Sequence, residues 1–352
     1  MTTDEKYMRR CLQLAENGRG FVAPNPMVGA VVVCNDRIIG EGFHREYGKA
    51  HAEVNAVNAV KDKSLLKKST VYVSLEPCAH YGKTPPCAQL LIDLGIPRVV
   101  IAVGDPFPQV SGQGVRMLRE AGAEVITGVL EAEARVQNKA FFCAQTRHRP
   151  YVYLKWAQTK DGFIDKLRVA GENPHPTPVS NDFTQMLVHK MRAETPAILI
   201  GTNTAINDNP SLTTRYWHGK NPVRVILDRQ RRIPACYRIF DGAAETLIFT
   251  ETVDTEIQEG NVRLLPLQFD GNMIANLLAA LHSRCINALL VEGGRSILQS
   301  FIDSGIWDEA FIEISETEFG AGTPAPVIRG KLLDEVVASN YRQQHWENDG
   351  NG

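Results

Sequence analysis

The sequence lacks the features of several specialised classes of protein. No apolar run approaches the roughly 20 residues that cross a bilayer, and the polar, acidic N-terminus does not resemble a secretory signal. The formal net charge of −2 provides no overall basic field for a nucleic-acid backbone. We therefore expect a cytosolic protein that binds neither a membrane nor a nucleic acid.

A disulfide framework and a standard dinucleotide motif are also absent. The seven cysteines are odd in number and spread along 352 residues, so reduced thiols are available as metal ligands. The second half lacks Gly-x-Gly-x-x-Gly after its first strand, which argues against a standard dinucleotide fold there.

The length predicts two α/β domains, because 352 residues are long for one core. A basic segment that ends in proline, residues 146–150, interrupts the alternation of strands and helices, so we place the domains at 1–147 and 148–352. The last ten residues and their neighbours are expected to form a loose tail. Expected strands are 27–34, 37–43, 70–76, 98–103, 123–128, 151–157, 197–201, 223–228, 246–249, 287–292 and 309–315, and the longer expected helices include 51–62, 130–146, 181–193 and 295–304.

Four residues of the first half have the spacing of a catalytic zinc site. His51 and Glu53 begin a predicted helix, Cys78 follows a strand, and Cys87 opens the next helix, where the helix dipole favours a thiolate. One imidazole and two thiolates leave the fourth tetrahedral position for water, which is typical of catalytic zinc. Glu53 is then free to move a proton from water to a leaving amine. This is the arrangement of the zinc nucleobase deaminases.

Each part of this pattern has a simpler interpretation when taken alone. A His-x-Glu pair is commonly a surface pair, and a Pro-Cys pair commonly contains a buried thiol. A structural zinc site would instead recruit His44 or His80 as a fourth protein ligand. The order of the residues along the predicted elements is more specific and favours a catalytic site.

The chain resembles one known family over about residues 4–315. The motifs are the gap of eight residues between Cys78 and Cys87, together with segments 24–29 (PNPMVG), 42–44 (GFH) and 105–112 (DPFPQVSG). They closely resemble the bifunctional deaminase/reductase of riboflavin biosynthesis. This resemblance implies a cytidine-deaminase-like three-layer α/β/α domain followed by a dihydrofolate-reductase-like α/β domain.

The resemblance also implies two reactions on small pyrimidine nucleotides. With Zn²⁺, the first domain hydrolyses the 2-amino group of 2,5-diamino-6-(5-phosphoribosylamino)pyrimidin-4-one. With NADPH, the second reduces the ribosyl group of 5-amino-6-(5-phosphoribosylamino)uracil to ribityl. Members of the family are commonly dimeric, so a homodimer is expected. The residues themselves do not distinguish NADPH from NADH.

The resemblance assigns ligand contacts to particular positions. Asparagine offers both a donor and an acceptor to a base edge, and the planar fork of arginine pairs with phosphate oxygens. The deaminase substrate is assigned to Asn25, His44, His80 and Lys83; the reductase substrate to Lys155, Arg192, Asp208, Leu212, Arg215 and Glu292; and the cofactor to Ala157, Thr204, Asp208, Gly294, Arg295 and Ser296.

Taken alone, these positions also have plainer interpretations. Asn25 could be a turn residue, His44 and His80 could support the fold, and Arg192 could lie on a helix surface. Segment 292–296 (EGGRS) is a phosphate cradle at a helix start or a tight turn, and segment 208–215 is a substrate loop or a solvated turn. Lys155 is more informative, because a charge within an apolar strand needs a partner. Bound water and Lys155 are both candidates for the proton donor in reduction.

The second half departs from the family in three places. Segment 171–181 is longer and rich in proline, Lys160 replaces a common apolar residue, and Arg229 replaces a common serine after Asp228. These changes bear on the cofactor side of the site.

Three other functions stay open. The first is a nucleic-acid-editing deaminase with an accessory domain, against which the near-neutral charge and the lack of a basic, aromatic stripe argue. The second is a zinc-stabilised scaffold, against which the presence of Glu53 beside three ligands argues. The third is a chain in which only one half is active.

Overall fold

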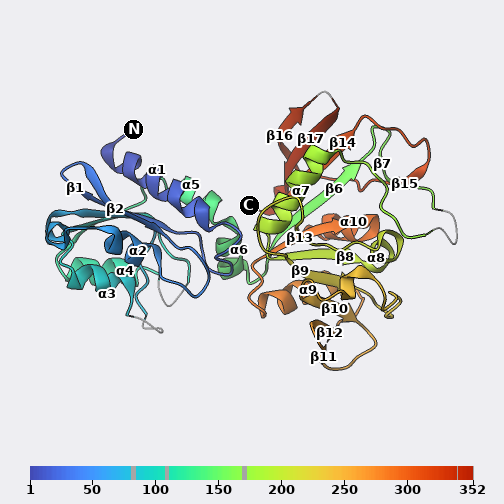
Figure 1. Cartoon of the computed structure of the whole chain (residues 1–352), viewed down its shortest axis with the longest axis horizontal. Coiled ribbons are helices and arrows are strands. Elements are labelled where there is room, and N and C mark those ends of the chain that lie inside the picture. Colours follow the sequence, from blue (N-terminus) through green and yellow to red (C-terminus); the bar gives the residue numbers. More distant parts are fainter. Residues whose placement is uncertain (81–84, 108–110, 169–172, 339, 352) are drawn as a thin grey trace. The chain divides into compact units, whose positions relative to one another are not determined.

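The structure is a computed structural model that describes residues 1–80, 85–107, 111–168, 173–338 and 340–351. The chain divides into two compact units, Met1–His148 and Arg149–Gly352 (Figure 1). None of the helices in these described ranges has the length and apolar character that a membrane span requires.

The first unit is built on a five-stranded sheet in the order β2-β1-β3-β4-β5. Strands β3, β4 and β5 are parallel, whereas β1 is antiparallel to both of its neighbours. Asn35 and Asp36 join β1 to β2 with positive φ angles of 49° and 58°, as the two-residue hairpin turn requires. The strand bounds are β1 (Gly29–Cys34), β2 (Arg37–Phe43), β3 (Thr70–Leu75), β4 (Arg98–Val103) and β5 (Glu124–Thr127).

Helices cover both faces of this sheet, which gives the three-layer α/β/α arrangement. Val32 packs in one core with Ala56 and Leu91, whereas its neighbour Val31 packs in another core with Met8 and Phe141. Adjacent strand residues serve opposite cores because successive side chains point to opposite faces of a sheet. The bounds are α1 (Thr3–Ala15), α2 (Ala52–Ala59), α3 (Cys87–Asp93), α4 (Gln113–Glu120), α5 (Glu131–Gln137) and α6 (Lys139–Arg147).

The second unit contains a ten-stranded sheet in the order β11-β12-β10-β9-β8-β13-β6-β14-β17-β16. The strands from β12 to β14 in this order are parallel, and helices cover both faces (Figure 1). The strand bounds are β6 (Tyr151–Gln158), β8 (Ala197–Gly201), β9 (Val223–Leu227), β10 (Thr246–Thr250), β11 (Ile257–Glu259), β12 (Val262–Pro266), β13 (Ala288–Gly293) and β14 (Glu309–Ser315). The helix bounds are α7 (Asp182–Glu194), α8 (Thr202–Asp208), α9 (Met273–His282) and α10 (Arg295–Ser304). A separate pair joins β7 (Phe163–Lys166) to β15 (Gly322–Pro324).

The expectation of a loose C-terminal tail is wrong. This part of the chain contains β16 (Lys331–Val337) and β17 (Tyr341–Glu347), and β17 pairs with β14 along its whole length. His345 also stacks on Phe311, with ring centroids 4.4 Å apart. Burial patterns give little sign of these strands, because every residue of β16 is exposed and none of β17 is fully buried. The pairing depends instead on backbone hydrogen bonds, to which every non-proline residue can contribute.

Candidate active sites

The structure brings His51, Cys78 and Cys87 together in the first unit. His51 is the N-cap of α2, Cys87 is the first residue of α3, and Cys78 follows β3. The His51 Nδ1 atom lies 3.7 Å from Cys78 Sγ and 3.4 Å from Cys87 Sγ, and the three atoms all lie within 4.8 Å of one another. Tetrahedral zinc with ordinary bond lengths would hold such N and S atoms about 3.5–3.8 Å apart. The three side chains therefore fit one zinc ion.

Glu53 lies beside this cluster but is not part of it. It occupies the first turn of α2, where its side chain is 3% exposed. Burial raises the pKa of the Glu53 carboxyl to about 7, because the charged form loses hydration. A carboxyl group with a pKa near neutrality can both accept and release a proton.

The predicted contacts for the deaminase substrate lie at different depths. His44 is buried, and its Nε2 atom is 3.1 Å from Asn25 Nδ2 while its Nδ1 atom is 3.1 Å from the Ala50 carbonyl oxygen. His80 is exposed, and Lys83 lies outside the described residues. Neither His44 nor His80 joins the cluster of ligand atoms found among the described residues, which argues against a four-ligand structural site.

Two buried residues that the sequence analysis missed hold the loops around this site. Glu76 accepts backbone N–H groups from Asp105, Gly112 and Val115 at 3.3, 3.0 and 3.2 Å. Asn138 accepts from the Met27 N–H at 2.8 Å and donates to the Met27 carbonyl at 2.9 Å. The sequence does contain one sign of the role of Glu76. It is a carboxylate at the end of the apolar segment 70–76, and a buried charge needs hydrogen-bond partners.

The second unit contains a cavity of about 1030 Å³. Ten of the residues that the resemblance assigns to the reductase line it: Lys155, Ala157, Arg192, Thr204, Asp208, Arg215, Glu292, Gly294, Arg295 and Ser296. Leu212 does not line it, because its side chain is 2% exposed and packs in a hydrophobic core with Ile226 and Ile248. Its φ of +52° marks a sharp turn of the backbone at this point.

Charged groups are concentrated in the cavity. Arg192 donates two hydrogen bonds to the Glu292 carboxylate, at 2.9 and 2.5 Å. Burial lowers the pKa of Lys155, while the negative charges of Glu292 and Glu313 oppose this effect. The side chain of Lys155 forms no hydrogen bond or ion pair with any described residue. Its ammonium group is therefore available to a ligand.

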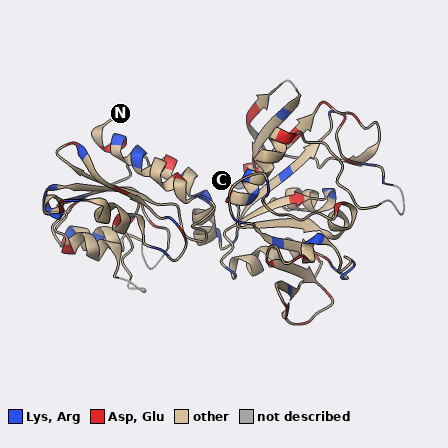
Figure 2. Ribbon diagram, in the orientation of Figure 1, with Lys and Arg blue, Asp and Glu red and all other residues tan. Residues whose placement is uncertain are grey.

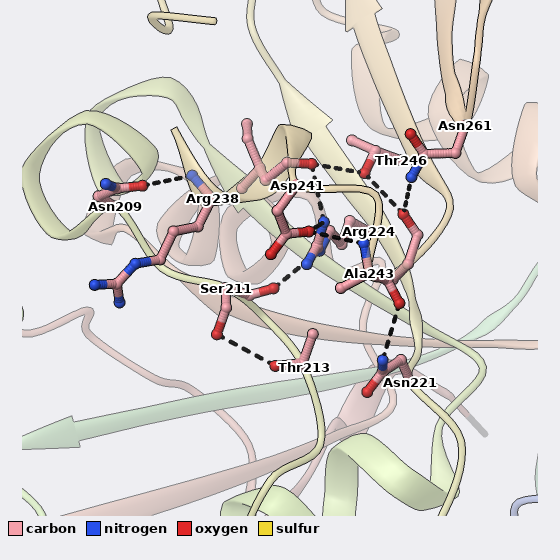
Figure 3. Close-up of polar contacts among 12 residues, drawn as sticks. Asn209, Ser211, Thr213, Asn221, Arg224, Arg238, Asp241, Ala243, Thr246 and Asn261 are labelled. Carbon is pink, nitrogen blue, oxygen red and sulfur yellow. Dashed lines mark hydrogen bonds and ion pairs between the residues drawn. The ribbon is translucent and has the colours of Figure 1, made fainter. Parts of the chain in front are cut away.

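A buried arginine supports the loop that carries Arg215. Arg224, on β9, donates to the Ser211 carbonyl at 2.9 Å, to the Ile239 carbonyl at 3.0 Å and to the Asp241 carboxylate at 2.9 Å (Figure 3). Its side chain is fully buried. The loop is thereby fixed to β9 of the sheet.

The segment between β13 and α10 is shaped for close approach. A Cβ atom on Gly294 would lie 2.9 Å from Thr204 Oγ1, so a larger residue would need the neighbour to move. Gly294 is also the N-cap of α10, and no side chain caps the helix. Free N–H groups at a helix start suit phosphate groups, so this segment fits a dinucleotide cofactor.

The proline-rich segment 173–178 also lines the cavity, through Pro176, Thr177 and Pro178. Arg168 holds it by donating to the His175 carbonyl at 2.7 Å and to Thr177 Oγ1 at 3.2 Å, and it pairs with Asp208 at 2.9 Å. The role of Arg168 could not be predicted from the sequence, because nothing local indicates which loop it contacts.

Comparisons with known proteins identify a family for each unit. Residues 1–103 match the family described as the cytidine and deoxycytidylate deaminase zinc-binding region, and residues 150–352 match the RibD C-terminal domain. The fold and the sites thus define a zinc-dependent deaminase joined to a reductase.

Full-length relatives specify the family. Riboflavin biosynthesis protein RibD of Aquifex aeolicus is 40% identical over 99% of this chain and 96% of its own length. RibD of Bacillus amyloliquefaciens is 41% identical over 92% of this chain and 87% of its own. The crystal structure of a diaminohydroxyphosphoribosylaminopyrimidine deaminase/5-amino-6-(5-phosphoribosylamino)uracil reductase from Thermotoga maritima is 37% identical, with a TM-score of 0.88, and the match covers 98% of this chain and 99% of that one. The chain belongs to the RibD family of bifunctional riboflavin-biosynthesis enzymes, which confirms the resemblance and the fold class inferred from the sequence.

Proposed function

We propose that the chain catalyses two consecutive steps of riboflavin biosynthesis. The first is the hydrolytic deamination of 2,5-diamino-6-(5-phosphoribosylamino)pyrimidin-4-one, and the second is the NADPH-dependent reduction of the resulting ribosylaminouracil to its ribityl form. One observation carries the proposal: a single chain, similar over 99% of its length to a RibD protein, contains both the three-ligand cluster and the charged cavity. We assign residues 1–147 to deamination and 148–352 to reduction.

In the first unit, His51, Cys78 and Cys87 hold zinc, which supplies an activated water molecule when bound. Glu53 takes a proton from that water and delivers it to the departing amino group, which leaves as ammonia. Burial, which raises the pKa of the Glu53 carboxyl, favours its role as a proton carrier. Asn25, His44 and His80 orient the pyrimidine, and Lys83 meets the substrate phosphate as a point charge.

In the second unit, NADPH supplies the hydride that reduces C1′ of the ring-opened ribosyl imine. Ala157, Thr204 and the segment from Gly294 to Ser296 hold the cofactor, and the cavity walls align it with the substrate and exclude water. Lys155 contacts the substrate ribose or the cofactor together with Asp208, and it is a candidate donor of the proton that balances the hydride. Glu292 contacts the substrate, and Arg192 and Arg215 hold its phosphate. The backbone turn at Leu212 shapes the same loop.

Small pyrimidine nucleotides are the proposed ligands, with the protein in the cytosol as a homodimer. Figure 2 favours small ligands over a nucleic acid, since basic and acidic residues are interspersed along the ribbon of both units. A duplex-sized or single-strand site would instead require a continuous basic surface.

To test this proposal, the purified protein is incubated with the diaminopyrimidinone nucleotide and NADPH. Ammonia release and loss of cofactor absorbance are measured separately, and bound zinc is measured by elemental analysis. We expect both activities, with zinc removal abolishing ammonia release while the uracil nucleotide, supplied directly, is still reduced. Protein without zinc, or RNA binding in moderate salt without turnover of the nucleotide, would contradict the proposal. Ammonia release without reduction would leave only the first half active.

A further inference from the structure

One face of α7 lines the reductase cavity and contains a histidine to which no role has been given. Gln185, Val188, His189 and Arg192 all line the cavity, and their spacing of three, four and seven residues places them on one side of a helix. The side chain of His189 is 4% exposed. A histidine is therefore held inside the wall, one turn away from Arg192.

One nitrogen of this ring is already occupied. The backbone N–H of Arg215 donates a hydrogen bond to His189 Nδ1 at 2.9 Å. Because Nδ1 accepts, a neutral ring carries its proton on Nε2. No further hydrogen bond reaches the ring from the described residues, and Tyr216 packs edge-on against it with ring centroids 4.7 Å apart. The Nε2–H group is therefore a donor of fixed tautomer that is left for a ligand.

The surroundings keep the ring neutral and select the charge of that ligand. Burial first, and then the positive charges of Arg192 and Arg215, lower the pKa of His189 to about 4. A neutral donor near two guanidinium groups matches an anionic acceptor, whereas a cation would be repelled. Glu292 neutralises part of the charge of Arg192. Because the His189 ring is uncharged, its N–H group can contribute to binding an anion without adding to the repulsion between Arg192 and Arg215.

We propose that His189 Nε2–H donates a hydrogen bond to the phosphate monoester of the reductase substrate, beside Arg192 and Arg215. This role rests on the proposed reductase function and extends it to the recognition of phosphate. His189 also positions Arg215 through Nδ1, so one ring connects the substrate loop to the ligand. Since the phosphate is remote from C1′, His189 contributes to KM more than to kcat.

Two substitutions separate the two nitrogens of the ring. His189→Asn retains an acceptor near Nδ1 but loses the donor at Nε2, whereas His189→Gln places an amide N–H near Nε2 and loses the acceptor. Steady-state reduction is measured in the full chain, with the uracil nucleotide and with the same compound after its phosphate has been removed enzymatically. The NADPH Kd is measured by fluorescence titration, and ammonia release from the first unit serves as the control in the same chain.

We expect His189→Asn to raise KM for the phosphorylated substrate about tenfold, the effect of losing one hydrogen bond to a charged group. KM for the dephosphorylated compound and the NADPH Kd should stay within about twofold, and His189→Gln should retain the preference for phosphate. An unchanged phosphate preference in His189→Asn, or a loss of that preference in His189→Gln only, would overturn the proposal. So would a weaker NADPH Kd with an unchanged substrate KM, since the donor would then serve the cofactor. If His189→Asn does not fold, His189→Ala takes its place as the variant without the donor, with the same expected rise of about tenfold in KM for the phosphorylated substrate. Failure of the wild type to oxidise NADPH would refute the reductase function itself.

Discussion

Replacement of Arg224 by methionine tests whether the buried arginine supports the substrate loop. Methionine fills similar space with a flexible apolar chain, so the main change is the loss of three hydrogen bonds. Ile239 keeps a bond from Thr246 Oγ1 at 3.0 Å, and Asp241, which is 38% exposed at its side chain, keeps the Ala243 N–H at 2.9 Å and reaches water. The Ser211 carbonyl is the acceptor left without its partner.

An unpaired buried acceptor costs about 1–3 kcal/mol. Arg224 Nη2 is itself buried without a partner, so removing it recovers part of that cost, and we expect a net loss of about 2 kcal/mol. For a unit of this size, that corresponds to a fall in Tm of about 4–8 °C. Reductase KM should also rise, because Ser211 and Thr213 contact the Arg215 side chain.

Scanning calorimetry of the full chain, with both activities measured below the transition, provides the assay. Thr246→Val is the matched control, since it removes a hydroxyl from the same network without touching the loop, and we expect about 1 kcal/mol from it and no change in KM. An Arg224→Met protein with the Tm and KM of the wild type would refute this account. A parallel loss of ammonia release would show that the effect is not confined to the second unit.

Three further changes have defined outcomes. Glu53→Gln should keep zinc, as measured by elemental analysis, but reduce ammonia release by about 10²–10⁴-fold; normal turnover would mean that another group carries the proton. Lys155→Ala should reduce the rate of NADPH oxidation by about 10²-fold or more while ammonia release persists, and loss of both activities together would show that the roles of the units are misassigned. The pKa of His189, about 4, lies below its ordinary value of 6.5, so between these pH values the native state binds fewer protons than the unfolded state and stability rises with pH. The free energy of unfolding, measured by urea titration at pH 4.5 and 6.5, should therefore differ less between the two pH values for His189→Asn than for the wild type. An equal difference in the two proteins would contradict the buried, neutral ring.

Features that depend on nearby residues could be predicted well. The spacing of Thr2 and Glu5 predicts a capping box, and α1 begins with one. Asn35 and Asp36 between two apolar runs predict a hairpin turn, and these residues join β1 to β2. The metal ligands could be predicted for the same reason. Each lies next to the start of a helix or the end of a strand, and the nearby residues indicate where that element begins or ends. Leu212 and the C-terminal strands show the opposite case, since neither the direction of a loop side chain nor the pairing of exposed strands follows from local pattern.

The sequence by itself determined the two α/β units, the identity of the zinc ligands and the separate carboxyl of Glu53, because helix starts, apolar strands and residue spacing are encoded locally. Only the tertiary structure decided which distant groups meet: the bond from Arg215 to His189, the support of Ser211 by Arg224, and the packing of segment 173–178 against the cavity. Those contacts join residues on separate elements. The order of the strands within the sheet determines which of these residues lie close together, and the sequence pattern of one segment does not encode that order.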